Sequence, residues 1–130
     1  MPTKNEAREV CRLFSSLVKS NLHRFSKLRC QLNAPRSHGV YVIYNPKKTV
    51  LHVGRSIRGK QGLLQRIKEH LNNQSSFSTV YLRSMGRTLR KGYMYRYLPL
   101  ASPRKRALLE SLAIGLLCPK HLGLGLKKSK

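Results

Sequence analysis

Two short runs of β-branched and aromatic residues, joined by a turn, most constrain how this chain folds. The first run covers residues 39–44 (Gly-Val-Tyr-Val-Ile-Tyr), and the second covers residues 49–53 (Thr-Val-Leu-His-Val). Asn45-Pro46-Lys47-Lys48 lies between them. Two such runs around an Asn-Pro turn predict a β-hairpin. The hairpin would hold Tyr41 and His52 close together on neighbouring strands.

The remaining patterns predict helices on both sides of the hairpin and two further strands. Apolar residues recur at helical spacing over residues 5–32, opposite a basic face. This helix is expected to pack on the domain, with nucleic-acid contacts from its basic face as the alternative. Helices are also predicted over residues 63–71 and 102–117, because Ser102-Pro103 is a favourable helix start and Pro119 stops the second. Residues 77–82 and 93–98 are strand candidates.

Together these elements predict an α/β (α+β) fold with a small, mostly antiparallel sheet. The hairpin is expected at the centre of the sheet, with helices flanking it. We expect an N-terminal, amphipathic basic helix in residues 1–35, the main domain in residues 36–123 and a basic tail in residues 124–130. The tail is rich in glycine and lysine, so it is expected to be disordered or to order only on a partner.

The charge of the chain identifies its partner class. It has 27 Lys and Arg against 4 Asp and Glu, a net charge of +23 with neutral histidines. Such an imbalance favours binding to a polyanion, most simply nucleic acid, DNA or RNA. The basic residues are spread along the whole chain, which argues against a membrane partner. Charge alone does not separate a nuclease from a component of an RNA–protein assembly.

The cysteines and the apolar segments indicate an intracellular protein, cytoplasmic or in a nucleoid or nucleus. Cys11, Cys30 and Cys118 form no CxxC pair, so they are expected to be buried, reduced thiols. The apolar run over residues 108–118 is too short to span a bilayer. No secretory signal is predicted at the N-terminus.

Few residues in the chain could support phosphodiester chemistry. The four acids are all glutamates, and Glu110 stands inside an apolar helical stretch where a charge needs a partner or a metal. Its alternative role is an ion pair with Lys105 or Arg106. Arg66 and His70 are four residues apart and share a helix face. An arginine fork matches phosphate oxygens, whereas His70 alone could be a surface residue.

These residues, in this order, resemble the GIY-YIG nuclease family. Gly39-Val40-Tyr41 matches its first triplet, and His52-Val53-Gly54 matches the second with histidine in place of tyrosine. The Arg66…His70 helix and the Glu110 helix, followed by Cys118-Pro119, are similar to the family's next two blocks. The resemblance covers about residues 36–123, and it implies a small three-stranded, mostly antiparallel sheet with flanking helices. Leu122-Gly123 stands where many members have an asparagine.

The resemblance implies a metal-dependent endonuclease that hydrolyses phosphodiester bonds. Tyr41 would be the base or proton relay with His52 assisting, Arg66 would hold the phosphate, and His70 would support proton transfer. Glu110 would bind Mg²⁺ or Mn²⁺. Arg66 and the positive field are expected to lower the pKa of Tyr41. Tyr41 could instead be an ordinary packing residue of the hairpin.

Two basic segments are candidates for nucleic-acid contacts. The segment after the hairpin holds Arg55, Arg58 and Lys60, and a later basic loop holds Arg87, Arg90 and Lys91. The first could equally be a solvated connection. Since the chain has little room for a separate recognition module, selectivity for substrate shape, or specificity supplied by a protein partner, is expected. The alternative to the enzyme is a catalytically inactive nucleic-acid-binding protein derived from the same fold, with His52 marking the loss of catalysis.

Overall fold

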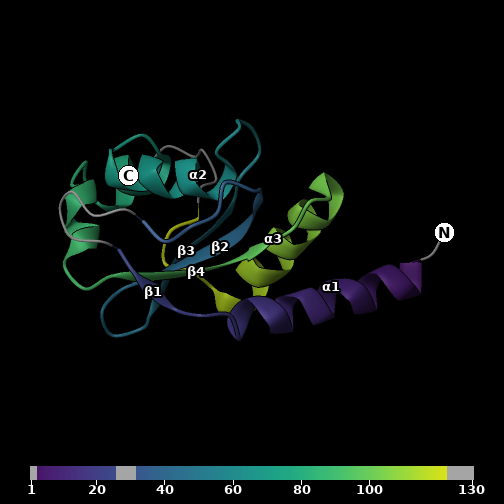
Figure 1. The fold of residues 1–130 in the computed structure, drawn as a ribbon. Helices are drawn as coiled ribbons and strands as arrows, with labels where there is room; N and C mark the ends of the chain where they lie inside the picture. The colour runs from purple at the N-terminus through teal and green to yellow at the C-terminus, as the bar shows by residue number, and fades with distance from the viewer. Residues whose placement is uncertain (1–2, 26–31, 123–130) are drawn as a thin grey trace.

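The fold has three layers in the computed structural model, which describes residues 3–25 and 32–122 (Figure 1). The middle layer is an antiparallel sheet in the order β1-β4-β2-β3. Its strands are β1 (His23–Arg24), β2 (Gly39–Tyr44), β3 (Val50–Arg55) and β4 (Met94–Pro99). Helix α2 (Gly62–Leu71) covers one face, and α1 (Thr3–Val18) and α3 (Pro103–Leu117) cover the other.

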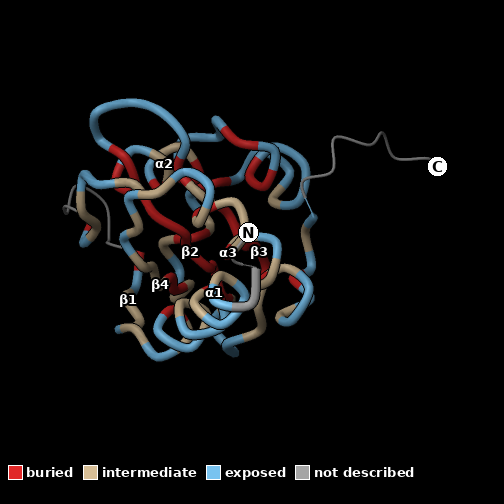
Figure 2. The backbone as a smooth tube through the Cα atoms, turned by 90° about the vertical axis from the view of Figure 1, so that its right-hand side faces the viewer, coloured by how far each residue is buried: buried red, intermediate tan, exposed pale blue. Residues whose placement is uncertain are grey.

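Strand β2 is buried along its whole length because both faces of the sheet are covered (Figure 2). Tyr41 and Ile43 point into the core beneath α2, where they pack with residues such as Leu63 and Ile67. The alternate residues Val40 and Val42 point into a second core with Leu17, Leu109 and Ala113 of α1 and α3. The two-residue period of the strand therefore divides its side chains between two cores.

The sequence predicted several of these elements correctly. The hairpin is confirmed, as are the helices at α2 and α3 and the strand at β4. Ser102 caps α3 by accepting a 3.2 Å hydrogen bond from the Lys105 amide, and Pro103 is the first helical residue. An α+β architecture with helices beside an antiparallel sheet is therefore observed.

The sheet differs from the prediction in two ways. It has four strands, because the short strand β1 pairs with β4 where a continuous helix over residues 5–32 was predicted. Helix α1 ends at Val18, and the Ser20 hydroxyl donates to the Leu17 carbonyl just beyond it. The predicted helix over residues 26–31 lies outside the described residues. The hairpin is not wholly central either, because β3 is an outer strand.

The strand predicted over residues 77–82 is wrong: Phe77–Tyr81 forms a short π-helix (η1). Local hydrogen bonds form this conformation: the Leu82 amide donates to the Phe77 carbonyl five residues earlier at 3.0 Å, and the Thr79 hydroxyl donates to the Ser75 carbonyl at 3.0 Å. The predicted basic loop contains a 3-10 helix (η2, Gly86–Arg90). The prediction of buried thiols is wrong for Cys11 and Cys118, which are exposed, whereas Cys30 and the tail over residues 124–130 lie outside the described residues.

Candidate active site

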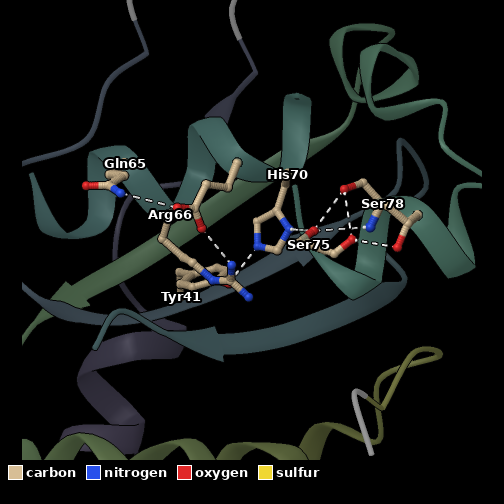
Figure 3. A network of polar contacts seen from close by, with 8 residues as sticks. Tyr41, Gln65, Arg66, His70, Ser75 and Ser78 are labelled. Carbon is tan, nitrogen blue, oxygen red and sulfur yellow. Dashed lines mark hydrogen bonds and ion pairs between the residues drawn. The ribbon is translucent and has the colours of Figure 1, made fainter. Parts of the chain in front are cut away.

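A buried chain of hydrogen bonds runs from the hairpin into α2 and on to η1 (Figure 3). The hydroxyl oxygen of Tyr41 lies 2.6 Å from Nε2 of His70. Nδ1 of His70 lies 2.6 Å from the hydroxyl oxygen of Ser75, which lies 2.8 Å from that of Ser78. Tyr41, His70 and Ser78 are fully buried, and Ser75 is nearly so. The structure thus joins Tyr41 and His70 by a direct hydrogen bond.

One arrangement of protons uses every bond of this network. Tyr41 donates to Nε2 of His70, and Nδ1–H donates to Ser75; Ser75 donates to Ser78, whose hydroxyl donates to the Ser75 carbonyl at 3.3 Å. The Ser78 amide fills the second acceptor position on the Ser75 hydroxyl at 3.2 Å. This assignment gives a neutral His70. Burial also lowers the pKa of His70 well below its usual range.

The register of the hairpin makes room for the Tyr41 hydroxyl. Tyr41 pairs with Gly54 across the strands, and Ile43 pairs with His52, so His52 and Tyr41 are diagonal neighbours with ring centroids 5.9 Å apart. A Cβ atom added at Gly54 would lie 2.4 Å from the Tyr41 hydroxyl oxygen. The glycine of the second triplet is therefore required by the close approach of this phenol.

Burial governs the acidity of Tyr41. Burial raises the pKa of Tyr41 strongly, although the positive charge and hydrogen bond of Arg66 act in the opposite direction. The expected lowering by neighbouring charge is therefore outweighed, and the phenol stays protonated at neutral pH. In this state Tyr41 donates a hydrogen bond to His70 and does not itself act as a free base.

Arg66 lies beside this network on α2, one turn before His70 (Figure 3). Its Nη1 forms a 2.7 Å ion pair with Glu69, and its side chain is 32% exposed. Burial opposes the charge of the guanidinium, but Tyr41 and Glu69 together raise the pKa of Arg66. The group is a permanent cation anchored between a phenol and a carboxylate, with one part still open to a ligand.

His52 is the most unusual polar side chain of the site. Its ring is only 7% exposed, and neither ring nitrogen has a hydrogen-bond partner among the described residues. The ring stacks on Phe77 with centroids 4.9 Å apart, and it meets His70 edge-on at 5.1 Å. Burial, together with the charges of His121 and Arg66, lowers the pKa of His52 to about 3. His52 is therefore a neutral imidazole whose two ring nitrogens are buried, and the backbone of His121 beside it raises its pKa in opposition to the burial.

Glu110 faces the site from α3, but its partner is not one that the sequence indicated. Its carboxylate accepts a 2.9 Å hydrogen bond from Arg55 of β3. Lys105 instead pairs with Glu9, and the buried Arg106 donates to the Leu100 carbonyl. Burial raises the pKa of Glu110, whereas Arg55 and Arg66 lower it. The two remaining acids, Glu6 and Glu69, are also paired, so all four carboxylates have a cationic partner.

Two hollows meet at the candidate site. A central cleft of about 290 Å³ is lined by residues of β3, α2 and α3 that include His52, Arg66 and Glu110. A loop pocket of about 390 Å³ lies beside it and is lined by residues 55–59 and by α2. Arg55, Ile57 and Arg66 line both hollows, so they form one continuous groove. Its lining contains three arginines, Arg55, Arg58 and Arg66, and two glutamates, Glu69 and Glu110.

The structure separates the two predicted nucleic-acid-binding segments. Arg55 and Arg58 line the groove, and Lys60 belongs to the same exposed loop before α2. The other segment is η2, where Gly86 packs against the carbonyls of His70 and Leu71 at the opposite end of α2. Three predicted basic residues are therefore remote from the groove: Arg87, Arg90 and Lys91.

Sequence reasoning missed Ser75, Ser78 and His121. Ser75 lies in a polar stretch that indicated only a helix end, and Ser78 lies in the segment predicted as a strand, so nothing marked them as partners of His70. His121 falls near the end of the predicted main domain, where it had no assigned role. Its amide donates to the Leu51 carbonyl at 2.9 Å, which extends the outer edge of β3 and brings the imidazole to 5.5 Å from His52. For His121, the sequence signal was its position as a polar residue soon after Pro119, where the chain leaves the last predicted helix.

The residues present fit a divalent cation only if the substrate completes its coordination. No group of three His, Cys, Asp or Glu side chains that could hold a metal occurs in residues 3–25 and 32–122. Glu110 supplies one carboxylate in a solvent-accessible cleft. Mg²⁺ and Mn²⁺ favour oxygen ligands, and Mg²⁺ retains several waters while using one or two carboxylates and substrate phosphates. The donor set is therefore compatible with Mg²⁺ or Mn²⁺ and contains no preformed cage.

No protein-family model matches the chain, and no curated protein shows significant similarity to it. None of the helices in the described part of the chain has the length and hydropathy that crossing a bilayer requires.

Proposed function

We propose that the protein is a metal-dependent endonuclease of GIY-YIG type that hydrolyses phosphodiester bonds in nucleic acid. The observation that carries this proposal is the central cleft itself. It brings an unpartnered neutral imidazole, a guanidinium and a carboxylate together from β3, α2 and α3. These are the base, the phosphate clamp and the metal ligand that hydrolysis of a phosphodiester needs.

The roles follow from the position and charge of each group. Arg66 and Arg55 would bind the non-bridging oxygens of the scissile phosphate, since both line the groove. His52 would accept a proton from the attacking water, whose oxygen forms the new bond to phosphorus as the ester bond breaks. An arriving phosphate raises the pKa of His52 because negative charge favours the protonated ring.

Tyr41 and His70 are positioning residues in this scheme. They pack against the ring of His52, with ring centroids 5.9 and 5.1 Å from it. Tyr41 also interacts with the guanidinium of Arg66 and favours its charged form. Glu110 would hold the divalent cation, with waters and the phosphate as further ligands. The bound ion would supply Lewis-acid stabilisation of the charge that develops on the leaving oxygen.

A second candidate function is nucleic-acid binding without cleavage. It is favoured by the Arg55–Glu110 ion pair, which already neutralises the proposed metal ligand at 2.9 Å. The net charge of +23 would support tight binding whether or not bonds are cut. A protein of this kind would serve as a clamp or as a component of an RNA–protein assembly.

Cleavage assays with a matched pair of variants distinguish these functions. Labelled single-stranded DNA, branched DNA and structured RNA are incubated with Mg²⁺, Mn²⁺ or EDTA. Glu110→Gln should reduce metal-dependent cleavage at least about 100-fold, because the variant loses the charged ligand. Glu9→Gln is the control. Glu9 on α1 is also ion-paired, but neither Glu9 nor its partner Lys105 lines the groove.

Equal cleavage by the two variants, or cleavage that persists in EDTA, would contradict the proposed mechanism. Tight binding without cleavage under any metal would identify the binding protein instead. A steep dependence of the binding constant on salt is expected in either case, so it does not discriminate between the two functions.

A further inference from the structure

A row of three stacked rings leads from His52, which lines the central cleft, to the surface. His52 stacks on Phe77 with an interplanar angle of 18°, and Phe77 stacks on Tyr81 with ring centroids 5.5 Å apart and an angle of 11°. Phe77 is fully buried, whereas Tyr81 is 40% exposed. The outermost ring of the row is therefore partly open to solvent, two ring-to-ring contacts from His52.

His121 adds a second ring to the exposed end of this row. Its centroid lies 6.2 Å from that of Tyr81 and 5.7 Å from that of Phe77. A 3.4 Å contact from its Nε2 to the Ser76 hydroxyl connects it to a residue that lines the central cleft. Tyr81 and His121 thus form an aromatic ledge at the rim of the cleft. Its backbone is held on one side by η1 and on the other by the pairing of residue 121 with β3.

The surroundings of the ledge combine apolar surface with positive charge. Leu122 and Ile57, which are 44% and 61% exposed, line the cleft beside Arg55 and Arg66. Arg83 is exposed two residues after Tyr81. Exposed aromatic rings next to a cationic groove match the surface that binds single-stranded nucleic acid, where bases stack on rings and phosphates follow the charge. A paired duplex keeps its bases stacked inside and cannot use the rings.

We propose that Tyr81 and His121 form a stacking platform for an unpaired base, so that the substrate is a nucleic acid with unpaired nucleotides beside the scissile bond. That the bound nucleic acid is a substrate depends on the proposed nuclease function, whereas stacking on the platform requires only binding. It adds a base-binding site to the phosphate-binding and chemical groups of the cleft. The sequence-independent chemistry of stacking fits a selectivity for structure over sequence.

The binding arm of the test needs no cleavage. An oligonucleotide carrying one 2-aminopurine, whose fluorescence falls on stacking, is titrated in EDTA as a single strand and as a duplex of the same sequence. Wild type should quench the single strand on binding. Tyr81→Ala should bind it about 5- to 150-fold more weakly, as expected for the loss of one base–aromatic stack, without quenching. Its affinity for the duplex should be unchanged.

Two matched variants control this arm. Tyr81→Phe keeps the ring and should retain both affinity and quenching. Val80→Ala removes a neighbouring exposed side chain that takes part in none of the ring contacts, and it should behave as wild type. Equal losses for the single strand and the duplex in Tyr81→Ala, or no loss for either, would overturn the platform. The platform would also be overturned if Tyr81 bound an apolar peptide and Tyr81→Ala left nucleic-acid binding unchanged.

The cleavage arm separates failure of the platform from failure of the nuclease. With Mg²⁺ or Mn²⁺, wild type should cut a strand with unpaired nucleotides at the labelled position faster than its duplex, and Tyr81→Ala should lose that preference. Cleavage without the preference overturns the platform and leaves the nuclease standing. Selective quenching with no cleavage of any substrate overturns the nuclease and leaves the platform as the recognition site of a binding protein.

Discussion

Replacing His52 by phenylalanine should make folding less sensitive to acid. The imidazole is neutral when folded because burial lowers its pKa from 6.5 to about 3, whereas the unfolded chain titrates near 6.5. Between these values the unfolded state binds more protons than the folded state, so stability is complete above pH 6.5 and falls as the pH decreases towards 3. Phenylalanine cannot titrate, and it can keep the stacking on Phe77.

The size of the effect follows from the two pKa values. Each pH unit below 6.5 removes about 1.4 kcal/mol from the free energy of unfolding, so His52 alone should cost about 2 kcal/mol at pH 5. His70 changes stability in the same direction, since burial lowers its pKa as well. Wild type should therefore lose more than about 2 kcal/mol between pH 7.5 and 5, and His52→Phe should lose about 2 kcal/mol less.

Urea denaturation followed by circular dichroism at pH 7.5 and pH 5.0 measures this difference. His23→Phe is a suitable comparison: His23 lies on β1, and its pKa is lowered by burial, but its ring is only partly buried. It should change the pH dependence less than His52→Phe. An identical loss of stability on acidification in wild type and His52→Phe would refute the assignment of a buried, neutral imidazole at this position.

Three further predictions concern the site and the groove. Tyr41→Phe should lower the free energy of unfolding by about 1–3 kcal/mol, measured by urea denaturation, because it leaves the buried Nε2 of His70 without its partner. Gly54→Ala should lower the free energy of unfolding more than Gly115→Ala does in the same measurement. An added Cβ at Gly54 collides with the Tyr41 hydroxyl, whereas at Gly115 it meets nothing within 4 Å. Arg58→Ala should reduce the slope of log affinity against log salt by about 0.7 on a single strand, measured by fluorescence anisotropy, because it removes one phosphate contact. An unchanged slope would exclude the groove as a phosphate path.

Sequence reasoning succeeded where the pattern was local. The β-branched and aromatic run over residues 39–44 and the Asn-Pro turn specified the hairpin, and Ser102-Pro103 specified the start of α3. It failed at residues 77–82, where aromatic and β-branched residues resembled a strand but local hydrogen bonds, including the one from the Leu82 amide to the Phe77 carbonyl, form a π-helix. Strand β1 was missed because two residues carry no detectable period.

The candidate site shows the same division. The spacing of Arg66 and His70 placed both on α2, next to the hairpin. The partner of Glu110 could not be inferred, since Arg55 is 55 residues away and meets it only through the packing of α3 against β3. The burial that sets the acidity of Tyr41 depends on the covering helix and is likewise invisible in the sequence.

The position of Glu110 on α3 has a consequence for the order in which the molecule assembles. Tyr41, His52, Arg66 and His70 lie within 30 consecutive residues of one hairpin and one helix, so the loops that close between them are short. Glu110 joins them only when the last helix docks. A nascent chain, or one whose last helix has locally detached, would keep the imidazole–phenol network and the basic loop pocket but lack the acid and the α3 side of the central cleft. Under the proposed function, binding of nucleic acid would then precede the capacity to cut it, and the docking of one helix would separate the two.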